Sequence, residues 1–172
     1  MRRLVFAGMM MGLAVLPARA DYIGDQMDAC FQPLTPASRT LIVEACGKLL
    51  QLGELPVATI QSPAFVARGN AYAAGADFKR ALDDLSTAAD IDPNNPAPLD
   101  ARGMVLMKQR KFSDAFDDFD AAAKMKDDDA MALYGRGLSL AKQSKDGAAD
   151  MAKAAAIDPG MADFYADNGL VP

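Results

Sequence analysis

The residues of this chain that could do chemistry are mainly acidic. Aspartates gather in three clusters: Asp83-Asp84, Asp117-Asp118-Asp120 and Asp127-Asp128-Asp129. Neighbouring residues on a helix point in different directions, so adjacent aspartates do not form one catalytic site. We therefore expect these clusters to lie on solvated helix faces. The third cluster is expected to begin a helix, because acidic side chains are favoured near a helix N-terminus.

Other catalytic and metal-binding patterns are missing from the sequence. There is no histidine among the 172 residues, which removes Ser-His and Cys-His nucleophilic pairs and most zinc sites. No cluster has the alternating aspartates of a calcium loop. The sequence contains 11 methionines, and a copper site is a weaker alternative to their use as apolar filler. We expect no enzyme activity, no cofactor and no metal.

The N-terminus has the pattern of a secretory signal peptide, residues 1–20. Arg2 and Arg3 precede an apolar run, and Ala18-Arg19-Ala20 has the small-residue pattern of a cleavage site before Asp21. A short membrane anchor is the alternative, but a bilayer span needs roughly 20 apolar residues. We expect cleavage, export to the periplasm or beyond, and no membrane insertion afterwards.

The two cysteines, Cys30 and Cys46, follow this segment. In an exported chain such a pair predicts a disulfide, and two buried free thiols are the alternative. Asp25–Phe31 is expected to form a short helix. Thr35-Pro36 is expected to start a second helix that ends near Leu52. The disulfide would then join these two helices.

An Arg-Gly pair returns three times at a spacing of 34 residues, as Arg68-Gly69, Arg102-Gly103 and Arg136-Gly137. Such a period indicates an array of helical hairpins, each unable to bury its apolar face alone. Apolar residues recur at fixed distances from each glycine, with spacings of three and four that give one helical stripe. Each small glycine would let two helices approach closely.

The segment 68–95, RGNAYAAGADFKRALDDLSTAADIDPNN, resembles a tetratricopeptide repeat almost from end to end. Asp77 is placed as an N-cap between the two helices of this unit, and Pro93 and Pro159 mark boundaries between units. The third unit departs from the pattern, because its inter-helix turn is two residues short and its second helix is made mostly of small residues.

The resemblance implies an all-α fold, an α-solenoid of about three helix-turn-helix repeats. We expect an N-terminal helical pair over residues 21–61 and a C-terminal capping helix over residues 160–172. The repeats between them are expected at 62–95, 96–129 and 130–159, which together span 62–159.

In tetratricopeptide arrays the first helix of each unit lines a concave groove that holds an extended or helical peptide. Carried over by register, the groove positions in this chain are Val66, Asn70, Ala73, Asp100, Met104, Met107, Lys108, Tyr134, Leu138, Ala141 and Lys142. Each could equally be an ordinary surface residue. Arrays that clamp a C-terminal carboxylate carry a lysine where this chain has Val66, so carboxylate capture is not expected. The methionines instead suggest an adaptable apolar strip.

The charge of the chain narrows the class of partner. Without residues 1–20 the chain carries 15 basic and 23 acidic residues, a net charge of −8. Nucleic acids and anionic membranes require a basic surface, so neither is expected as a partner. The leading hypothesis is a scaffold of the bacterial cell envelope that binds another protein or peptide. A self-assembling homodimer, an enzyme accessory protein and a periplasmic enzyme are the alternatives.

Overall fold

The computed structural model describes residues 15–53 and 55–171, and most of the expected signal peptide (residues 1–14) lies outside this range. The described secondary structure is helical, which confirms the all-α class. Its elements in chain order are α1 (Val15–Cys30), α2 (Arg39–Gln51), a π-helical turn η1 (Val57–Gln61), α3 (Ser62–Ala74), α4 (Phe78–Ile91), α5 (Ala97–Lys108), α6 (Phe112–Met125), α7 (Ala130–Lys142), α8 (Ala148–Ile157) and α9 (Met161–Asp167).

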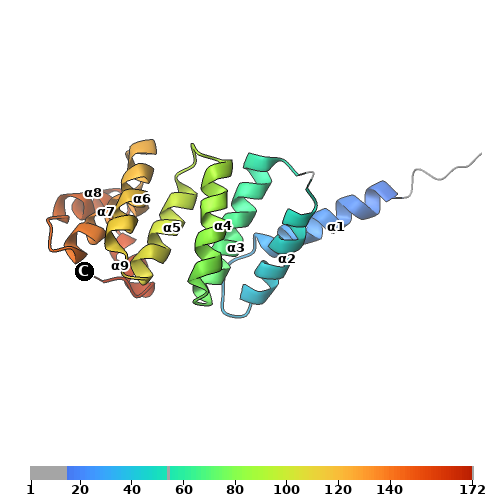
Figure 1. Cartoon of the computed structure of the whole chain (residues 1–172), viewed down its shortest axis with the longest axis horizontal. Coiled ribbons are helices and arrows are strands. Elements are labelled where there is room, and N and C mark those ends of the chain that lie inside the picture. The colour runs from blue at the N-terminus through green and yellow to red at the C-terminus, as the bar shows by residue number, and fades with distance from the viewer. Residues whose placement is uncertain (1–14, 54, 172) are drawn as a thin grey trace, which may run out of the picture.

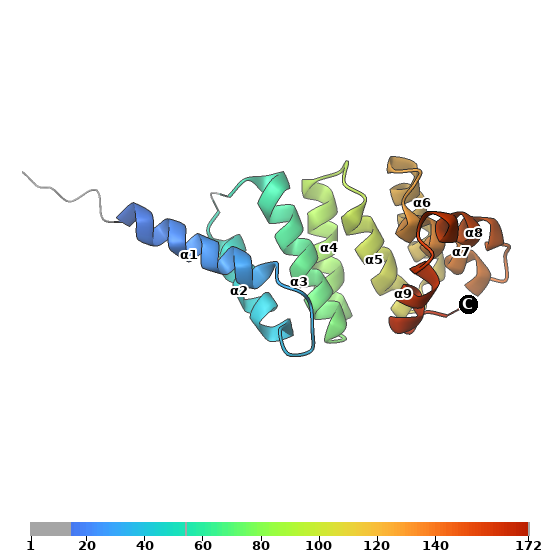
Figure 2. The same cartoon turned by 180° about the vertical axis from the view of Figure 1, so that it is seen from behind.

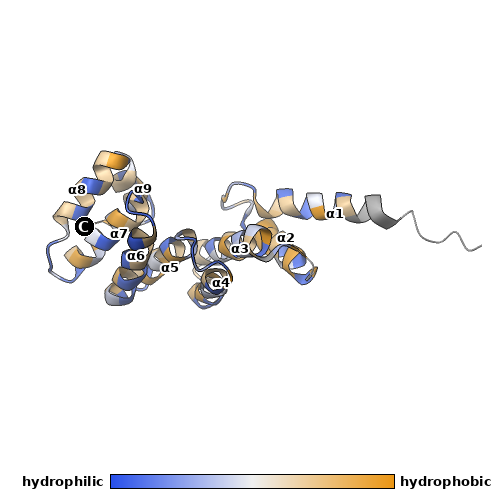
Figure 3. Cartoon of the chain, turned by 90° about the horizontal axis from the view of Figure 1, so that it is seen from above, coloured by the Kyte–Doolittle hydropathy of each residue, from blue (hydrophilic) through white to orange (hydrophobic). Residues whose placement is uncertain are grey.

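The helices form a solenoid in which each packs on its neighbours in sequence (Figure 1). Three hairpins, α3–α4, α5–α6 and α7–α8, stack side by side after the α1–α2 pair, and α9 packs against the third hairpin. Viewed from above, α4 and α6 lie on one side of the array, whereas α1 and α9 lie on the other (Figure 3). The α-solenoid expected from the 34-residue period is therefore confirmed.

The repeated glycines lie where two helices of one hairpin meet. A Cβ atom at Gly103 would lie 2.8 Å from the Phe119 ring, and one at Gly69 would lie 2.9 Å from Cγ of Leu85. At Gly137 the nearest atom is the carbonyl oxygen of Gly147, at 2.6 Å. Any larger side chain would force the helices apart, so each glycine sets the spacing of its own hairpin.

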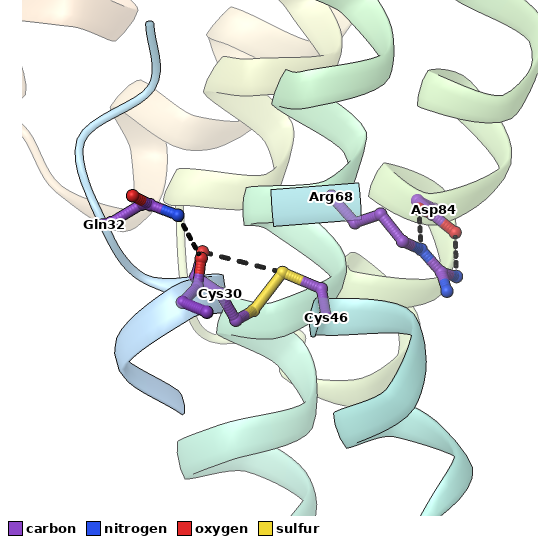
Figure 4. The surroundings of a disulfide bond; sticks show 6 residues. Cys30, Gln32, Cys46, Arg68 and Asp84 are labelled. Carbon is purple, nitrogen blue, oxygen red and sulfur yellow. Dashed lines mark hydrogen bonds and ion pairs between the residues drawn. A yellow bond between two sulfur atoms is a disulfide. The ribbon is translucent and has the colours of Figure 1, made fainter. Parts of the chain in front are cut away.

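The repeated arginines of the Arg-Gly pairs bind aspartates on the second helix of the same hairpin. Arg68 donates from Nε and Nη2 to Asp84 at 2.7 and 2.8 Å (Figure 4). Arg102 makes the same bidentate contact with Asp118, which lies 16 residues after it, as Asp84 does after Arg68. In the third hairpin Arg136 reaches Asp150 after only 14 residues. The short turn expected from the sequence is wrong: the turn before α8 spans 143–147 and is longer than the turns 75–77 and 109–111, whereas α8 has 10 residues where α4 and α6 have 14.

These pairs correct one expectation from the sequence. Asp84 and Asp118 were expected on solvated faces, but they are 8% and 7% exposed and are held by the repeated arginines. Their cluster neighbours Asp83 and Asp117 are exposed, as expected. The reason for the difference is helical geometry: of two adjacent residues, one faces the first helix and the other faces solvent.

Capping side chains begin two of the repeat helices. Asp77 accepts a hydrogen bond from the backbone N–H of Arg80 at the start of α4. Asp129 accepts from the N–H groups of Met131 and Ala132 at the start of α7, where the acidic cluster was expected to begin a helix. These contacts satisfy backbone donors that have no partner inside the helix.

The N-terminal helices are joined by a disulfide between Cys30, the last residue of α1, and Cys46, in the middle of α2 (Figure 4). The structure therefore has the bridge and not two free thiols. Helix α1 is longer than expected, and α2 begins at Arg39 instead of directly after Thr35. The Thr35 hydroxyl still accepts from the N–H of Ser38, which holds a tight turn before the helix.

No helix within the described residues is both long and apolar enough to span a membrane.

The last helix, α9, lies on the same side of the array as α1 (Figure 3). Figure 2 shows it in front of the third hairpin. Its Tyr165 is fully buried and donates a hydrogen bond from its hydroxyl to the carbonyl oxygen of Met131 at 2.8 Å. The Tyr165 ring stacks on Tyr134, with ring centres 4.8 Å apart. The segment therefore covers α7 on the side of the solenoid opposite α4 and α6, which we call the inner face.

Candidate functional site

The inner side of the solenoid contains an open cavity of about 610 Å³. Helices α3 and α5 form its floor, and α9 and the loop before α2 border it through Phe164 and Leu34. The two borders lie on the same side of the array in Figure 3, so the cavity is a groove along the inner face. We refer to it below as the groove.

Six of the eleven residues expected in the groove line it. They belong to the first helices of the first and second hairpins: Val66, Asn70, Ala73, Asp100, Met104 and Lys108. The remaining lining is mostly apolar and includes Ala97, Val105 and Met131. The register of the repeats therefore places these side chains together at one surface.

The expected residues from the third hairpin lie elsewhere. Tyr134 and Leu138 are buried in one hydrophobic cluster with Tyr165 and Leu170 of the C-terminal segment. Met107, from the second hairpin, is buried in the same cluster. Ala141 is half-buried and does not line the groove. The C-terminal segment therefore occupies the part of the inner face that the sequence assigned to a ligand.

A second, shallower hollow of about 450 Å³ lies beside the end of the chain. Its lining residues come from the ends of α5 and α7, the start of α4 and α6, and the C-terminal tail: Phe78, Met107, Lys108, Arg110, Phe112, Lys142, Gly169, Leu170 and Val171. Lys142, which the repeat register placed in the groove, lines this hollow instead, together with Lys108.

Asp100 is the most unusual polar residue of the groove. Its side chain is on the first turn of α5, and the residue is only 5% exposed. Its buried oxygen Oδ1 has no hydrogen-bond partner among the described residues. Burial, with the nearby Asp129 carboxylate adding to the effect, raises the pKa of Asp100 to about 8.

Lys108 lies at the opposite end of α5. Its Nζ donates to Oδ1 of Asn168, just after α9, at 3.2 Å. Burial lowers the pKa of Lys108 below its ordinary value. Eight residues of helix separate Asp100 from Lys108, a rise of about 12 Å. The groove therefore has an acidic end and a basic end, with apolar residues between them.

Some lining residues could not be found from the repeat register. Leu34 comes from the loop before α2, and Phe164 and Asn168 come from the C-terminal segment. None of them occupies a repeat position, so only the path of the chain in three dimensions brings them to the groove. The sequence identified Asp129 only as part of a cluster that begins a helix. It lies near Asp100 because α7 packs on α5.

The groove combines a few polar groups with mostly apolar walls. Within residues 15–53 and 55–171, no group of three or more His, Cys, Asp or Glu side chains is placed to hold a metal ion. Its polar groups are one amide (Asn70), two carboxyl groups (Asp100 and Asp129) and the Lys108–Asn168 pair, on mostly apolar walls. Such a lining can bury an apolar segment and orient it by a few polar contacts.

Comparison of the sequence with known proteins found no matching family model and no matching curated protein. Solved structures do match. "MamA 41-end" from Desulfovibrio magneticus RS-1 has a TM-score of 0.68 at 20% identity, over 87% of this chain and 82% of that chain. The structure "MamA MSR-1 C2" has a TM-score of 0.61 at 12% identity, over 88% and 87%.

A further match is YrrB, described as a TPR protein with an unusual peptide-binding site. Its TM-score is 0.62 at 20% identity, over 91% of this chain and 80% of that chain. These identities establish a shared architecture and say nothing about partners. Together with the 34-residue register and the stacked hairpins, they show that the chain has the fold of the tetratricopeptide repeat proteins.

Proposed function

We propose that this chain is a protein-interaction scaffold of the bacterial cell envelope that binds a peptide or helix in its groove. The observation that supports this most strongly is the open, mostly apolar groove on the inner face of α3 and α5. Its lining includes six side chains that the repeat register assigned to ligand binding. The peptide-binding site of YrrB supports the same use of the fold, by analogy only.

Helix α9 restricts where the ligand can lie. Because Tyr165 and Leu170 fill the inner face of the third hairpin, the free groove extends over the first and second hairpins. A ligand would therefore contact Val66, Asn70 and Met104 and leave Tyr134 and Leu138 untouched. The function would be exerted by binding and not by catalysis.

Two features support export. The N-terminal 20 residues have the pattern of a signal peptide, and the Cys30–Cys46 disulfide is of a kind that persists in oxidising compartments. Mass spectrometry of the protein purified from its own cells should find Asp21 as the first residue. A chain that retains Met1 or Arg2 would contradict export with cleavage.

The groove is tested by capture of partners from an envelope extract. The parent chain is compared with a variant that carries Asn70→Arg and Ala97→Arg, which narrows the groove without changing a buried residue. The control carries Thr87→Arg and Ser113→Arg, which add the same charge on α4 and α6. We expect one set of proteins to be retained by parent and control and lost by the groove variant.

Equal capture by all three chains would contradict the groove as the binding surface. The homodimer alternative is tested by light scattering over a wide concentration range. A mass that doubles with concentration in the parent and control, but not in the groove variant, would mean that the occupant of the groove is a second copy of the chain.

A further inference from the structure

The groove contains a buried carboxyl group that forms no hydrogen bond through Oδ1 with any described residue, that of Asp100. Buried aspartates elsewhere in the array have partners, since Asp84 is held by Arg68 and Asp118 by Arg102. Asp100 is as deeply buried as these two, yet its Oδ1 has no partner among the described residues. A buried polar group without a hydrogen bond lowers the stability of the folded state. A partner from outside the chain would remove this cost.

The surroundings of Asp100 define the chemistry of such a partner. The carboxyl group of Asp129 also lines the groove, so this end of it holds two carboxyl groups. Asp129 already accepts two backbone hydrogen bonds at the start of α7, which leaves Asp100 as the unpaired member. Around them the walls are apolar and include Met104, Met131 and Phe164. A cation carried on an apolar stem matches both properties.

We propose that Asp100 recognises a lysine or arginine side chain of the bound segment, which pairs with the carboxylate while its aliphatic stem packs on Met104 and Met131. This inference rests on the proposed function of the groove and names the ligand class. Lys and Arg side chains suit the site because their stems bury against apolar surface while the charged end reaches a polar group.

The basic end of the groove constrains a second position of the segment. Lys108 lies about 12 Å from Asp100 along α5 and would repel a second basic side chain there. In an extended segment this distance corresponds to about four residues. The bound segment therefore has its basic residue over Asp100 and an uncharged or acidic residue about four positions away, with apolar residues between.

The protonation of Asp100 couples to this recognition. Charged or titratable groups from three surrounding parts of the fold act on it: Asp118 on α6, Lys126 and Asp129 around the α6–α7 turn, and Tyr165 on α9. Burial raises the pKa of Asp100 to about 8, so the carboxyl is mostly protonated in the empty groove at neutral pH. A bound cation favours the ionised form, so binding releases a proton and becomes tighter as the pH rises towards 8.

The test starts from a random peptide phage library panned against the full chain without residues 1–20. Peptides are kept only if the Asn70→Arg, Ala97→Arg variant fails to bind them, so that they define the groove. They are then resynthesised and titrated against the parent, Asp100→Asn and a control, Asp117→Asn, whose exposed carboxylate lies on α6. Circular dichroism checks that each variant is folded.

We expect the selected peptides to share a basic residue among apolar ones. Replacing it with norleucine, or replacing Asp100 with asparagine, should weaken binding roughly 10- to 100-fold, the range of a charge-assisted hydrogen bond. The two changes together should cost little more than either alone, and Asp117→Asn should change nothing. Affinity for the parent, but not for Asp100→Asn, should rise between pH 6 and pH 8.

Two different failures can be distinguished. Groove-dependent peptides without a basic residue, or with equal affinity for the parent and Asp100→Asn, would overturn the role of Asp100 and leave the groove function standing. If panning yields no peptide that depends on the groove, the proposed function itself is overturned, and the inference about Asp100 with it.

Discussion

At the scale of single residues, the repeated arginine has a structural role that the motif alone does not show. Each of Arg68, Arg102 and Arg136 joins the two helices of its hairpin by two parallel hydrogen bonds to one aspartate. Arg102 and Arg136 also reach back to the preceding hairpin, where they bind Ser86 and Asp120. The arginine thus contributes both to a hairpin and to the contact between hairpins.

Removing one of these arginines should destabilise the protein. We expect Arg102→Met to lower the free energy of unfolding by about 2–4 kcal/mol, because Asp118 would remain buried without its partner. Urea denaturation measures the change. The control, Lys79→Met, breaks the exposed Lys79–Asp83 pair and should lower stability far less than Arg102→Met, because solvent screens an exposed pair. Equal losses in the two variants would contradict the assignment of Arg102 to a buried pair.

Asp100 predicts a dependence of stability on pH. Its folded pKa of about 8 lies above the value of about 4 in an unfolded chain, so the folded state holds an extra proton between these pH values. Stability therefore falls as the pH rises through this window. Asp100→Asn removes this titration, so from pH 5 to pH 8 it should gain about 3–4 kcal/mol of stability relative to the parent.

Thermal unfolding at pH 5 and pH 8 measures this effect, with Asp117→Asn as the control for loss of an exposed carboxylate. If Asp100→Asn and the parent lose stability in parallel between the two pH values, Asp100 is not protonated in the folded protein.

At the scale of elements, the turns inside the hairpins carry a repeated backbone feature. Ala76, Arg110 and Ser144 are spaced by 34 residues, and each has a positive φ near 60°. This conformation is unfavourable for residues with a Cβ atom and is the one in which glycine is preferred. The third hairpin keeps this residue as well, although its turn, 143–147, is longer than the turns 75–77 and 109–111.

Glycine should therefore stabilise such a turn. We expect Ala76→Gly to raise the free energy of unfolding by about 0.5–1 kcal/mol, despite the greater entropy of glycine in the unfolded chain. The same change at Ala152, an exposed position inside α8, should lower it by about 1 kcal/mol. Chemical denaturation of both variants is decisive, and a loss of stability at both positions would argue against the left-handed turn.

Helix α9 should depend on one aromatic side chain. Tyr165→Ala removes a fully buried ring that contacts Tyr134 and Phe119, and should cost about 3–5 kcal/mol. Hydrogen exchange should then show loss of protection in α9 and α7 and little change in α2. Unchanged stability and exchange would mean that the C-terminal segment does not dock on the inner face.

Much of the array could be predicted from the sequence, because each repeated position is determined by contacts within one hairpin. Gly103, for example, is required because the ring of Phe119 leaves no room for a Cβ atom. Glycine recurs at this position in every unit, and Leu85 takes the place of Phe119 in the first. The position of α9 could not be predicted in this way. Tyr165 reaches α6 and α7 at once, and such contacts depend on the curvature of the whole array rather than on any local pattern.

In the candidate site, too, the residues set by the repeat register could be predicted, and the contacts between distant parts of the chain could not. Asn70, Asp100 and Met104 were found because the register fixes the face of the first helix of each hairpin. Tyr134 was assigned to the same groove, but in the structure it is buried against Tyr165 of α9 and does not line the groove. The raised pKa of Asp100 could not be predicted from the sequence either, because it results from burial and from the nearby Asp129 at the start of α7.

At the scale of the whole molecule, the solenoid presents one free groove between two borders. The loop before α2, positioned next to the Cys30–Cys46 disulfide, supplies one border, and α9 supplies the other. Both ends of the array thus contribute to the surface on α3 and α5. The central claim is that a partner binds there, on the inner face of the first and second hairpins.

Site-specific photo-crosslinking tests this claim most directly. A benzophenone side chain replaces Ala97, which is exposed at the groove, or Thr87 on α4, and each chain is irradiated in an envelope extract. We predict a discrete adduct from position 97 that disappears when Asn70→Arg is added, and no such adduct from position 87. The same adducts from both positions, or an adduct at 97 that survives Asn70→Arg, would contradict binding in the groove.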